Sequence, residues 1–355
     1  MSYLPCTYKT AELTKGTVST IEKSFPRHLL NENTVVIRPD YMGICRADIK
    51  EIIGSRDIPT DRGPLFGHEL VGPVVFAGTG TGFQEGELVT FNPNITPNRT
   101  TGFAEYMFIH GSDVELDQAI IRVPEYDIIH NIWMPEPMVC IVHATRKLLE
   151  LSKLTTLEGK RVGIIGAGCS GIMFAMYAKH LGASVCLFNR GEMRRNFALE
   201  EQLLQADEVC SLTKTHAHSN AFDVVIVVST RVTQDILRIA ADLAADKAIL
   251  HIYGGTREND KFLTTSADID LIRRQELIHA TEYAGKHLRI SGAYGCYKDD
   301  YEESFRLHNA YPEQFPLEKI VSKEIDFGDF SKLVMQVASG EKDYPGKVVV
   351  RTNFE

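Results

Sequence analysis

The sequence has neither the cysteine pattern of a disulfide-linked protein nor an apolar segment long enough to cross a membrane. Its seven cysteines are odd in number, widely scattered and without a CxxC pair, which argues for a reducing compartment. No apolar run approaches the roughly 18–20 residues that span a bilayer. A secretory signal has a basic stretch followed by an apolar one, and the first residues contain no such pattern. We therefore expect a cytoplasmic protein without a membrane partner.

Positive charge is also scarce. Lys and Arg number 38 against 47 Asp and Glu, which gives a formal net charge of −9. Nonspecific nucleic-acid binding needs a basic surface, so we expect no nucleic-acid partner. A phosphorylated small molecule is compatible with this charge, because a few local arginines or lysines suffice to bind it.

Length and patterning indicate two domains. The chain has 355 residues, against roughly 150 residues for an average domain. Residues 33–108 have the composition of strands and turns, whereas residues 161–255 alternate strands with helices, which is typical of a doubly wound parallel sheet. We predict an α/β protein with a β-rich domain over 1–130 and 296–355 and a Rossmann dinucleotide-binding domain over 131–295.

A glycine-rich turn marks the predicted Rossmann domain. Gly166, Gly168 and Gly171 have the GxGxxG spacing, and they stand between an apolar strand and an apolar helix. The first glycine permits a tight turn, the second lets the backbone approach a pyrophosphate, and the third lets the helix pack closely on the strand. We expect Cys169 and Ser170, inside this turn, to contact the cofactor. The alternative is a purely structural turn.

The end of the next strand indicates which dinucleotide binds. NAD-specific sites usually place Asp or Glu there, whereas this chain has Asn189 and Arg190, followed by Arg194 and Arg195. A carboxylate repels a 2′-phosphate, and an arginine pairs with it. The sequence therefore favours NADP(H) over NAD(H). The alternative is that these arginines only solvate the start of the next helix.

Side chains that can bind a metal are spread over the β-rich domain and its boundary. Cys45 stands in GICRAD, His68 and Glu69 in GHELVG, and Glu136 in EPMVCIVHATRK. A catalytic zinc needs about three Cys, His or carboxylate ligands and one open position. No short metal-binding spacing links these residues. Each therefore also has a structural interpretation, as a packing thiol, a hydrogen-bonded histidine or a carboxylate at a helix N-terminus.

Together with VGIIGAGCSG, these segments resemble the zinc-dependent medium-chain dehydrogenase/reductase family, in the same order, over about residues 30–295. The resemblance implies a GroES-like β-rich domain with one catalytic zinc bound by Cys45, His68 and Glu136, and with Glu69 or water as a further ligand. It implies that Asp48 orients the zinc-bound histidine. It also implies a dimer or tetramer that transfers a hydride between a nicotinamide cofactor and a secondary alcohol or ketone.

Several positions depart from the family pattern. Residues 91–106 contain none of the four cysteines that bind a structural zinc in other members, so we expect no structural zinc. Ala47 replaces the Ser or Thr whose hydroxyl relays the proton. Lys50 stands where many members have His, and Lys50 and Arg56 are candidates to bind an anionic substrate group. Arg46 matches an arginine that contacts the cofactor pyrophosphate. For Lys50 and Arg56 the alternative is solvated surface charge.

The segment 41–57 is most similar to the ribulose-5-phosphate reductases of this family, which use NADPH. We therefore expect a polyol, sugar or polyol-phosphate substrate, with ribulose 5-phosphate and ribitol 5-phosphate as candidates. One alternative is a zinc-free quinone reductase, and another is a non-catalytic nucleotide sensor, which the loss of the relay hydroxyl at Ala47 favours. The remaining thiols, among them Cys186 and Cys210, are interpreted as packing or surface groups, and the tract 214–218 as a solvated loop.

Overall fold

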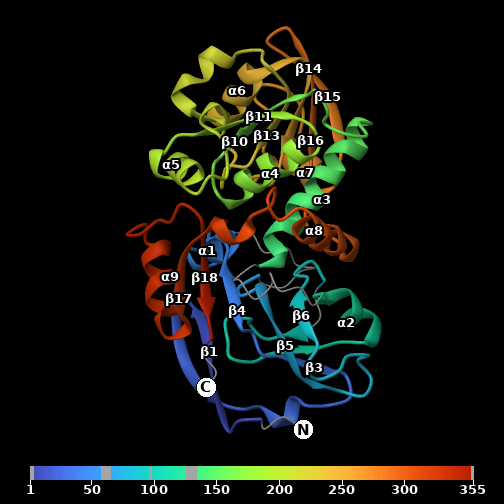
Figure 1. Cartoon of the computed structure of the whole chain (residues 1–355), viewed down its shortest axis with the longest axis vertical. Coiled ribbons are helices and arrows are strands. Elements are labelled where there is room, and N and C mark those ends of the chain that lie inside the picture. The colour runs from blue at the N-terminus through green and yellow to red at the C-terminus, as the bar shows by residue number, and fades with distance from the viewer. Residues whose placement is uncertain (1–3, 57–64, 96–97, 125–133, 353–355) are drawn as a thin grey trace. The chain divides into compact units, whose positions relative to one another are not determined.

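The protein was analysed as a computed structural model, which describes residues 4–56, 65–95, 98–124 and 134–352. The chain divides into two compact units (Figure 1). The first comprises Met1–Pro137, Tyr297–Asn309 and Val321–Glu355, and the second comprises Met138–Cys296 and Ala310–Ile320. The predicted boundary between residues 130 and 131 lies outside the described residues. Within those residues, no helix is both long and apolar enough to cross a membrane.

One segment belongs to a different unit from the one that the sequence suggests. Ala310–Ile320 packs with the second unit rather than with the β-rich domain. The reason is aromatic packing, since the ring of His180 lies 4.7 Å from that of Tyr311 and 5.4 Å from that of Phe315. His180 Nδ1 also lies 2.8 Å from Gln314 Oε1. The C-terminal part of the β-rich domain therefore consists of Tyr297–Asn309 and Val321–Glu355, without the residues between them.

The first unit is built mainly of strands. Its elements are β1 (Thr7–Thr14), β2 (Thr17–Ser24), η1 (Arg27–Leu29), β3 (Thr34–Ile37), β4 (Tyr41–Ile44), α1 (Arg46–Ile52), β5 (Glu69–Ala77), β6 (Leu88–Phe91), β7 (Asn98–Arg99), β8 (Met107–His110), α2 (Asp113–Ala119), β9 (Ile120–Arg122), α8 (Lys298–Ala310), β17 (Val321–Asp326), η6 (Phe327–Asp329), α9 (Phe330–Ala338) and β18 (Lys347–Arg351). Nine strands form one sheet, whose main path is β17-β18-β4-β5-β3-β8-β7, while β1 and β2 form a separate hairpin. The last strand, β18, pairs antiparallel with β4, so the red C-terminal strand lies beside a blue N-terminal one (Figure 1).

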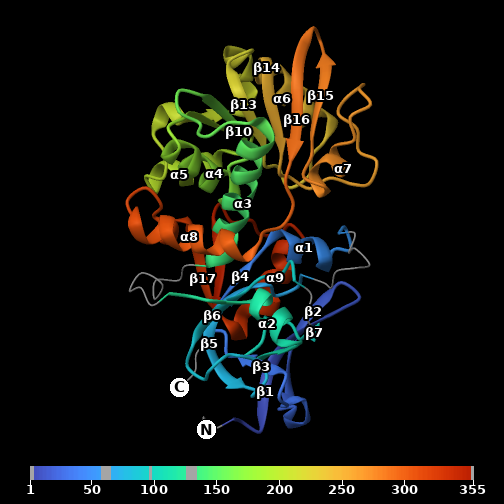
Figure 2. The ribbon, with the colours of Figure 1, turned by 90° about the vertical axis from the view of Figure 1, so that its right-hand side faces the viewer.

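The second unit alternates strands and helices. Its elements are α3 (Pro135–Ser152), which begins in the first unit, β10 (Arg161–Ile165), α4 (Cys169–His180), β11 (Ser184–Asn189), α5 (Glu192–Glu200), η3 (Ala206–Glu208), β12 (Val209–Ser211), η4 (Leu212–His218), β13 (Phe222–Val227), α6 (Gln234–Leu243), β14 (Ala244–Ile252), α7 (Ile269–Arg274), β15 (Ile278–Tyr283), β16 (Lys286–Gly292) and η5 (Leu317–Ile320). The sheet order is β12-β11-β10-β13-β14-β16-β15, in which the first six strands are parallel and have the 3-2-1-4-5-6 order of a Rossmann fold. The edge strand β15 runs antiparallel to β16 (Figure 2).

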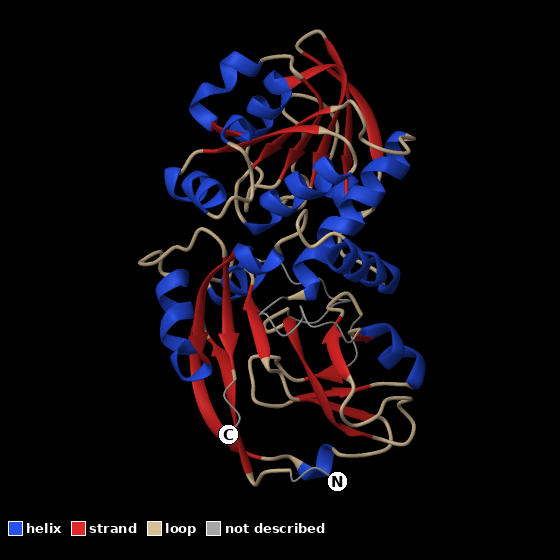
Figure 3. Ribbon diagram, in the orientation of Figure 1, coloured by secondary structure: helices blue, strands red, loops and turns tan. Residues whose placement is uncertain are grey.

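Burial explains why this unit forms a covered sheet. Residues Val224–Val227 of β13 are all buried, as are Val162–Ile165 of β10, because helices cover both faces of a parallel sheet (Figure 3). Such strands therefore consist of continuous apolar runs rather than alternating ones. The predicted α/β fold, a GroES-like β-rich domain joined to a Rossmann domain, is confirmed.

Candidate active site

Cys45 is the first residue of the candidate site and lies where β4 ends and α1 begins. It caps the helix, with extended backbone angles of φ −96° and ψ 155°. Its backbone N–H donates to Oδ2 of Asp48, one turn into α1, at 2.8 Å. This bond holds the chain at the strand–helix junction, and with it the position of the Cys45 thiol.

His68 is brought to Cys45 by the same carboxylate. Oδ1 of the fully buried Asp48 accepts a hydrogen bond of 3.0 Å from the backbone N–H of Gly67, the residue before His68. Gly67 has φ +71°, and a Cβ there would lie 2.6 Å from the backbone nitrogen of Phe103, so only glycine fits. Asp48 thus joins the two segments that carry Cys45 and His68.

The imidazole of His68 is oriented mainly by a backbone carbonyl. Nδ1 lies 2.7 Å from the carbonyl oxygen of Leu65 and 3.5 Å from Oδ1 of Asp48. Nε2, on the far side of the ring, is therefore the nitrogen suited to bind a metal. Burial by itself lowers the pKa of His68, but the charges and hydrogen bonds of Asp48 and Cys45 together outweigh burial and raise this pKa well above its ordinary value.

Glu69 begins β5, and its carboxylate is held by a residue that the sequence analysis missed. Nζ of Lys347 lies 2.8 Å from Oε1 and 2.6 Å from Oε2 of Glu69, and both side chains are nearly buried. The carboxylate fits because residue 43 is glycine, since a Cβ at Gly43 would lie 2.1 Å from Oε2. The only signal for Lys347 in the sequence is its place at the start of the closing strand.

Ligand atoms of Cys45, His68 and Glu69 all lie within 4.8 Å of one another. A thiol, an imidazole and a carboxylate are the donor types that zinc prefers, so these residues fit a catalytic metal. Burial and the charge of Glu69 raise the pKa of the Cys45 thiol, while His68 and Lys347 oppose this shift. Glu136 is buried in the first turn of α3, but its carboxylate is not part of this close group.

The basic residues near this group have definite partners. Arg56 forms an ion pair with the buried carboxylate of Glu51, which also accepts from the backbone N–H of Leu65 at 2.7 Å. Nη2 of Arg46 lies 2.5 Å from Oδ1 of Asp343, and both side chains are exposed. Lys50 lies in the last turn of α1 and is half-buried.

A half-buried cation near this group, Arg99, has no signal in the sequence. It lies on β7, with its guanidinium 5.0 Å from the centre of the Phe91 ring. Burial lowers the pKa of Arg99 to about 10, even though the charges of Asp48 and Glu51 act in the opposite direction. Arg99 therefore interacts electrostatically with two acids of α1.

The glycine turn in the second unit has the geometry that a dinucleotide requires. Gly166 has φ +119°, and a Cβ on Gly171 would lie 1.7 Å from the carbonyl oxygen of Gly166. Gly168 caps α4, which begins with Cys169 and Ser170, and a Cβ there would meet nothing within 4 Å. The first and third glycines are therefore required by the fold, whereas the second leaves room for a ligand.

The end of β11 carries the residues expected to select the cofactor. Oδ1 of Asn189 accepts from the backbone N–H of Ala167 at 3.2 Å, and its Nδ2 donates to the carbonyl of Gly191 at 2.9 Å. Nη1 of Arg195 donates to the carbonyls of Asn189 and Arg190, both at 2.9 Å. Arg190 is exposed, and Arg194 is half-buried. Arg195 thus shapes the loop, while Arg190 faces solvent.

Comparison with known proteins gives a match over the first unit. Residues 31–126 match the alcohol dehydrogenase GroES-like domain. The chain is 29% identical over 196 residues to a zinc-type alcohol dehydrogenase-like protein of Haemophilus influenzae, which is 50% of this chain and 55% of that protein. It is 30% identical over 153 residues to the ribulose-5-phosphate reductase of Streptococcus pneumoniae, which is 39% of this chain and 43% of that protein. The chain thus spans about half the length of these relatives.

Solved structures match nearly the whole chain. Galactitol-1-phosphate dehydrogenase from Escherichia coli has a TM-score of 0.71 at 20% identity, with 97% of this chain and 99% of that chain covered. A zinc-binding dehydrogenase from Sinorhizobium meliloti, bound to NADP, has a TM-score of 0.72 at 18% identity, with 98% and 100% covered. At this level of identity the likeness shows the fold.

Proposed function

Since the chain belongs to the zinc-dependent medium-chain dehydrogenase/reductase family, we propose that it transfers a hydride between NADP(H) and a secondary alcohol or ketone. The substrate class we propose is a polyol, a sugar or a polyol phosphate. The observation that carries this proposal is the close group formed by Cys45, His68 and Glu69. The donor types support a zinc ion, which when bound would polarise the substrate oxygen and lower the pKa of an alcohol.

The residues around this group support a metal site rather than a packed core. Asp48 accepts hydrogen bonds from the backbone at Cys45 and Gly67, so both ligand-bearing segments are fixed before any ligand binds. The Leu65 carbonyl fixes the imidazole of His68 from its other side, as outer partners of metal-bound histidines do. We propose Glu136 as a further ligand. Glu69, which already pairs with Lys347, is then a charge-balancing neighbour or an alternating ligand.

The second unit supports the choice of NADP(H). Asn189 stands where an NAD-specific site carries a carboxylate, and it is neutral. We propose that the exposed Arg190, which follows it, pairs with a 2′-phosphate, while Arg194 and Arg195 add positive charge at the start of α5. Gly168, Cys169 and Ser170 are proposed to contact the pyrophosphate at the N-terminus of α4.

The substrate contacts that we propose are fewer than the sequence suggests. Arg56 is paired with Glu51, and Arg46 with Asp343, so each would have to give up a partner to bind a phosphate. We propose Lys50, which lies half-buried in the last turn of α1, as a further candidate to bind an anionic substrate group. Ala47 supplies no hydroxyl to relay a proton, so this task falls to water, Lys50 or a carboxylate. We also propose a cytoplasmic dimer or tetramer, as in the family.

A substrate screen tests this function. NADPH and NADH oxidation would be followed with polyol phosphates, free polyols and ketoses, and the as-isolated protein would be analysed for metal. We expect reduction of a ketose or ketose phosphate with NADPH, bound zinc, and loss of both zinc and activity in Cys45→Ala. Activity that survives without zinc would favour a quinone reductase. Zinc and nucleotide binding without turnover of any substrate would favour a sensor.

A further inference from the structure

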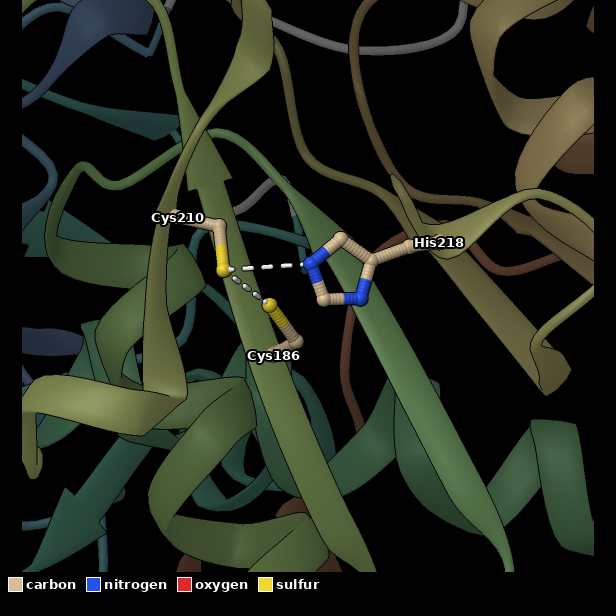
Figure 4. A group of neighbouring side chains, drawn as sticks. All are labelled: Cys186, Cys210 and His218. Atoms are coloured by element: carbon tan, nitrogen blue, oxygen red, sulfur yellow. Dashed lines mark hydrogen bonds between the residues drawn. The ribbon is translucent and has the colours of Figure 1, made fainter. Parts of the chain in front are cut away.

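A second group of metal-binding side chains lies in the Rossmann unit, away from the glycine turn. Cys186 on β11, Cys210 on β12 and His218 at the end of η4 point toward one another (Figure 4). Sγ of Cys186 lies 2.9 Å from Sγ of Cys210, and Sγ of Cys210 lies 3.7 Å from Nε2 of His218. One ligand atom from each residue lies within 4.8 Å of the other two.

The sheet topology brings these residues together. β11 and β12 are parallel neighbours in which Phe188 pairs with Cys210, and Cys186 lies two residues before Phe188 on the same face of β11. The short helix η4 then returns the chain over that face, so that His218 meets both strands. Residues 214–218, expected as a solvated loop, belong to the helix η4, in which Lys214 and His216 are exposed and His218 is half-buried.

Aromatic rings hold the imidazole of His218 in place. Its ring packs edge-on against Phe188, with centroids 5.4 Å apart, and stacks on Phe222, with centroids 6.1 Å apart and planes at 25°. A rigid orientation of this kind directs Nε2 at the two sulfur atoms without the loss of side-chain entropy on binding. The donor set is therefore preorganised.

From this arrangement we infer that Cys186, Cys210 and His218 bind a thiophilic divalent cation of the zinc class. Two thiolates and a neutral imidazole balance the charge of such an ion, which matters because Cys186 is buried. Bonds of about 2.3 Å in tetrahedral geometry place two sulfurs about 3.8 Å apart, so the thiols must separate by about 0.9 Å. Since Cys210 and His218 are only half-buried, solvent can supply the fourth ligand.

Cys186 and Cys210 are free cysteines in the structure, not a disulfide. The short Sγ–Sγ contact is a hydrogen bond between thiols. A metal ion would replace these protons and would fasten the three-residue edge strand β12 to β11. This ion would be additional to the one catalytic zinc that the family resemblance implies.

The number of metal ions bound per full chain tests this inference. The result does not depend on whether the proposed function is correct. Wild type, Cys210→Ser and His218→Ala would be titrated with cadmium, whose bonds to thiolates absorb in the ultraviolet. Cys296→Ser is the matched control for a cysteine, because Cys296 is buried outside the group. His216→Ala is the control for a histidine, because His216 lies on η4 and is exposed.

We expect wild type and both controls to bind one more cadmium ion per chain than Cys210→Ser does. His218→Ala should weaken binding of this ion at least about tenfold. Equal cadmium uptake by Cys210→Ser and wild type would overturn the inference. So would a Cys186–Cys210 disulfide in protein isolated without reductant, detected by mass spectrometry of peptides. Circular dichroism establishes that each variant is folded. The difference in bound cadmium between a protein with Cys210 and one with Cys210→Ser should be the same when Cys45→Ala has removed the catalytic ion from both.

Discussion

The ammonium group of Lys347 binds both carboxylate oxygens of Glu69, at 2.6 and 2.8 Å, although 278 residues separate the two in the chain. β18 carries Lys347 into the sheet beside β4, where Glu69 pairs with Gly43 across β4 and β5. One member of the candidate metal group thus depends on the C-terminal strand.

Lys347→Met should destabilise the protein by about 3–5 kcal/mol, because it leaves the carboxylate of Glu69 buried without its partner. Urea denaturation monitored on the β-rich unit measures this loss. The double variant Glu69→Gln, Lys347→Met should recover most of it, since no uncompensated charge then remains. The matched control is Lys23→Met, which breaks an exposed pair with Glu12 and should cost less than about 1 kcal/mol. Equal losses for the two lysine variants would contradict the buried-pair interpretation.

Asp48→Asn should lower zinc affinity about 10- to 100-fold while the chain still folds. The asparagine side chain has one oxygen, so it can accept a hydrogen bond from the backbone of Cys45 or of Gly67 but not from both. It also lacks the negative charge that faces His68. Competition with a chromophoric chelator measures the affinity. Asp343→Asn, at the exposed partner of Arg46, is the control and should leave zinc affinity unchanged. An unchanged affinity in Asp48→Asn would remove Asp48 from the site.

The sequence sufficed to predict features that depend on local pattern. The turn at Gly166, Gly168 and Gly171 follows from glycine spacing between a strand and a helix, and the structure has a strand–turn–helix there. Cys45 and His68 were identified through family resemblance, and the physical link between them is Asp48, only three residues from Cys45. Residues three apart lie one turn apart on the same side of a helix, so the contact between Cys45 and Asp48 can be predicted from their spacing.

Contacts that depend on tertiary pairing were not predictable in this way. Lys347 reaches Glu69 only because β18 closes the sheet onto β4, and His218 reaches Cys210 only because η4 folds back over β11. Arg99 is half-buried and interacts electrostatically with Asp48 and Glu51 of α1, and no local pattern in the sequence marks it. In each case the partner is determined by strand order and register, which composition and periodicity do not specify.

Two glycine variants separate the fold from cofactor binding. Gly171→Ala should prevent correct packing of α4, since its Cβ would lie 1.7 Å from the carbonyl oxygen of Gly166. Gly168→Ala meets nothing within 4 Å and keeps an ordinary negative φ of −81°, so the fold should tolerate it. Its methyl group should nevertheless exclude a pyrophosphate and weaken NADPH binding at least about tenfold. Thermal melting and NADPH fluorescence titration measure the two effects. Normal NADPH affinity in a folded Gly168→Ala would place the cofactor elsewhere.

Cofactor preference should follow charge at the end of β11. Arg190→Ala should weaken NADPH binding about tenfold or more, because a charged hydrogen bond contributes about 1.5–3 kcal/mol, and should leave NADH binding unchanged. Asn189→Asp should disfavour NADPH further through repulsion and favour NADH. Steady-state KM values for both cofactors measure the preference. Arg238→Ala, an exposed residue of α6, is the control. A parallel loss for both cofactors would mean that Arg190 acts on something other than the 2′-phosphate.

Asp268 gives the Rossmann unit an acid-sensitive contribution to stability. Burial alone would raise its pKa, but the N–H of Leu271 at 3.0 Å and the ammonium of Lys261 at 2.8 Å outweigh burial and lower it below the ordinary 3.8. A carboxyl group with a lowered pKa stabilises the folded state above the unfolded pKa, and this contribution disappears as the pH falls through the folded pKa.

Asp268→Ala should therefore cost about 1 kcal/mol at neutral pH, through loss of the cap of α7, and the difference from wild type should shrink below pH 3.8. Asp268→Asn keeps a capping oxygen and loses only the charge, so it should cost less at neutral pH. Urea midpoints of the three proteins, measured from pH 7 downward, test this order. A difference between wild type and Asp268→Ala that stays constant below pH 3.8 would show that the charge of Asp268 makes no contribution.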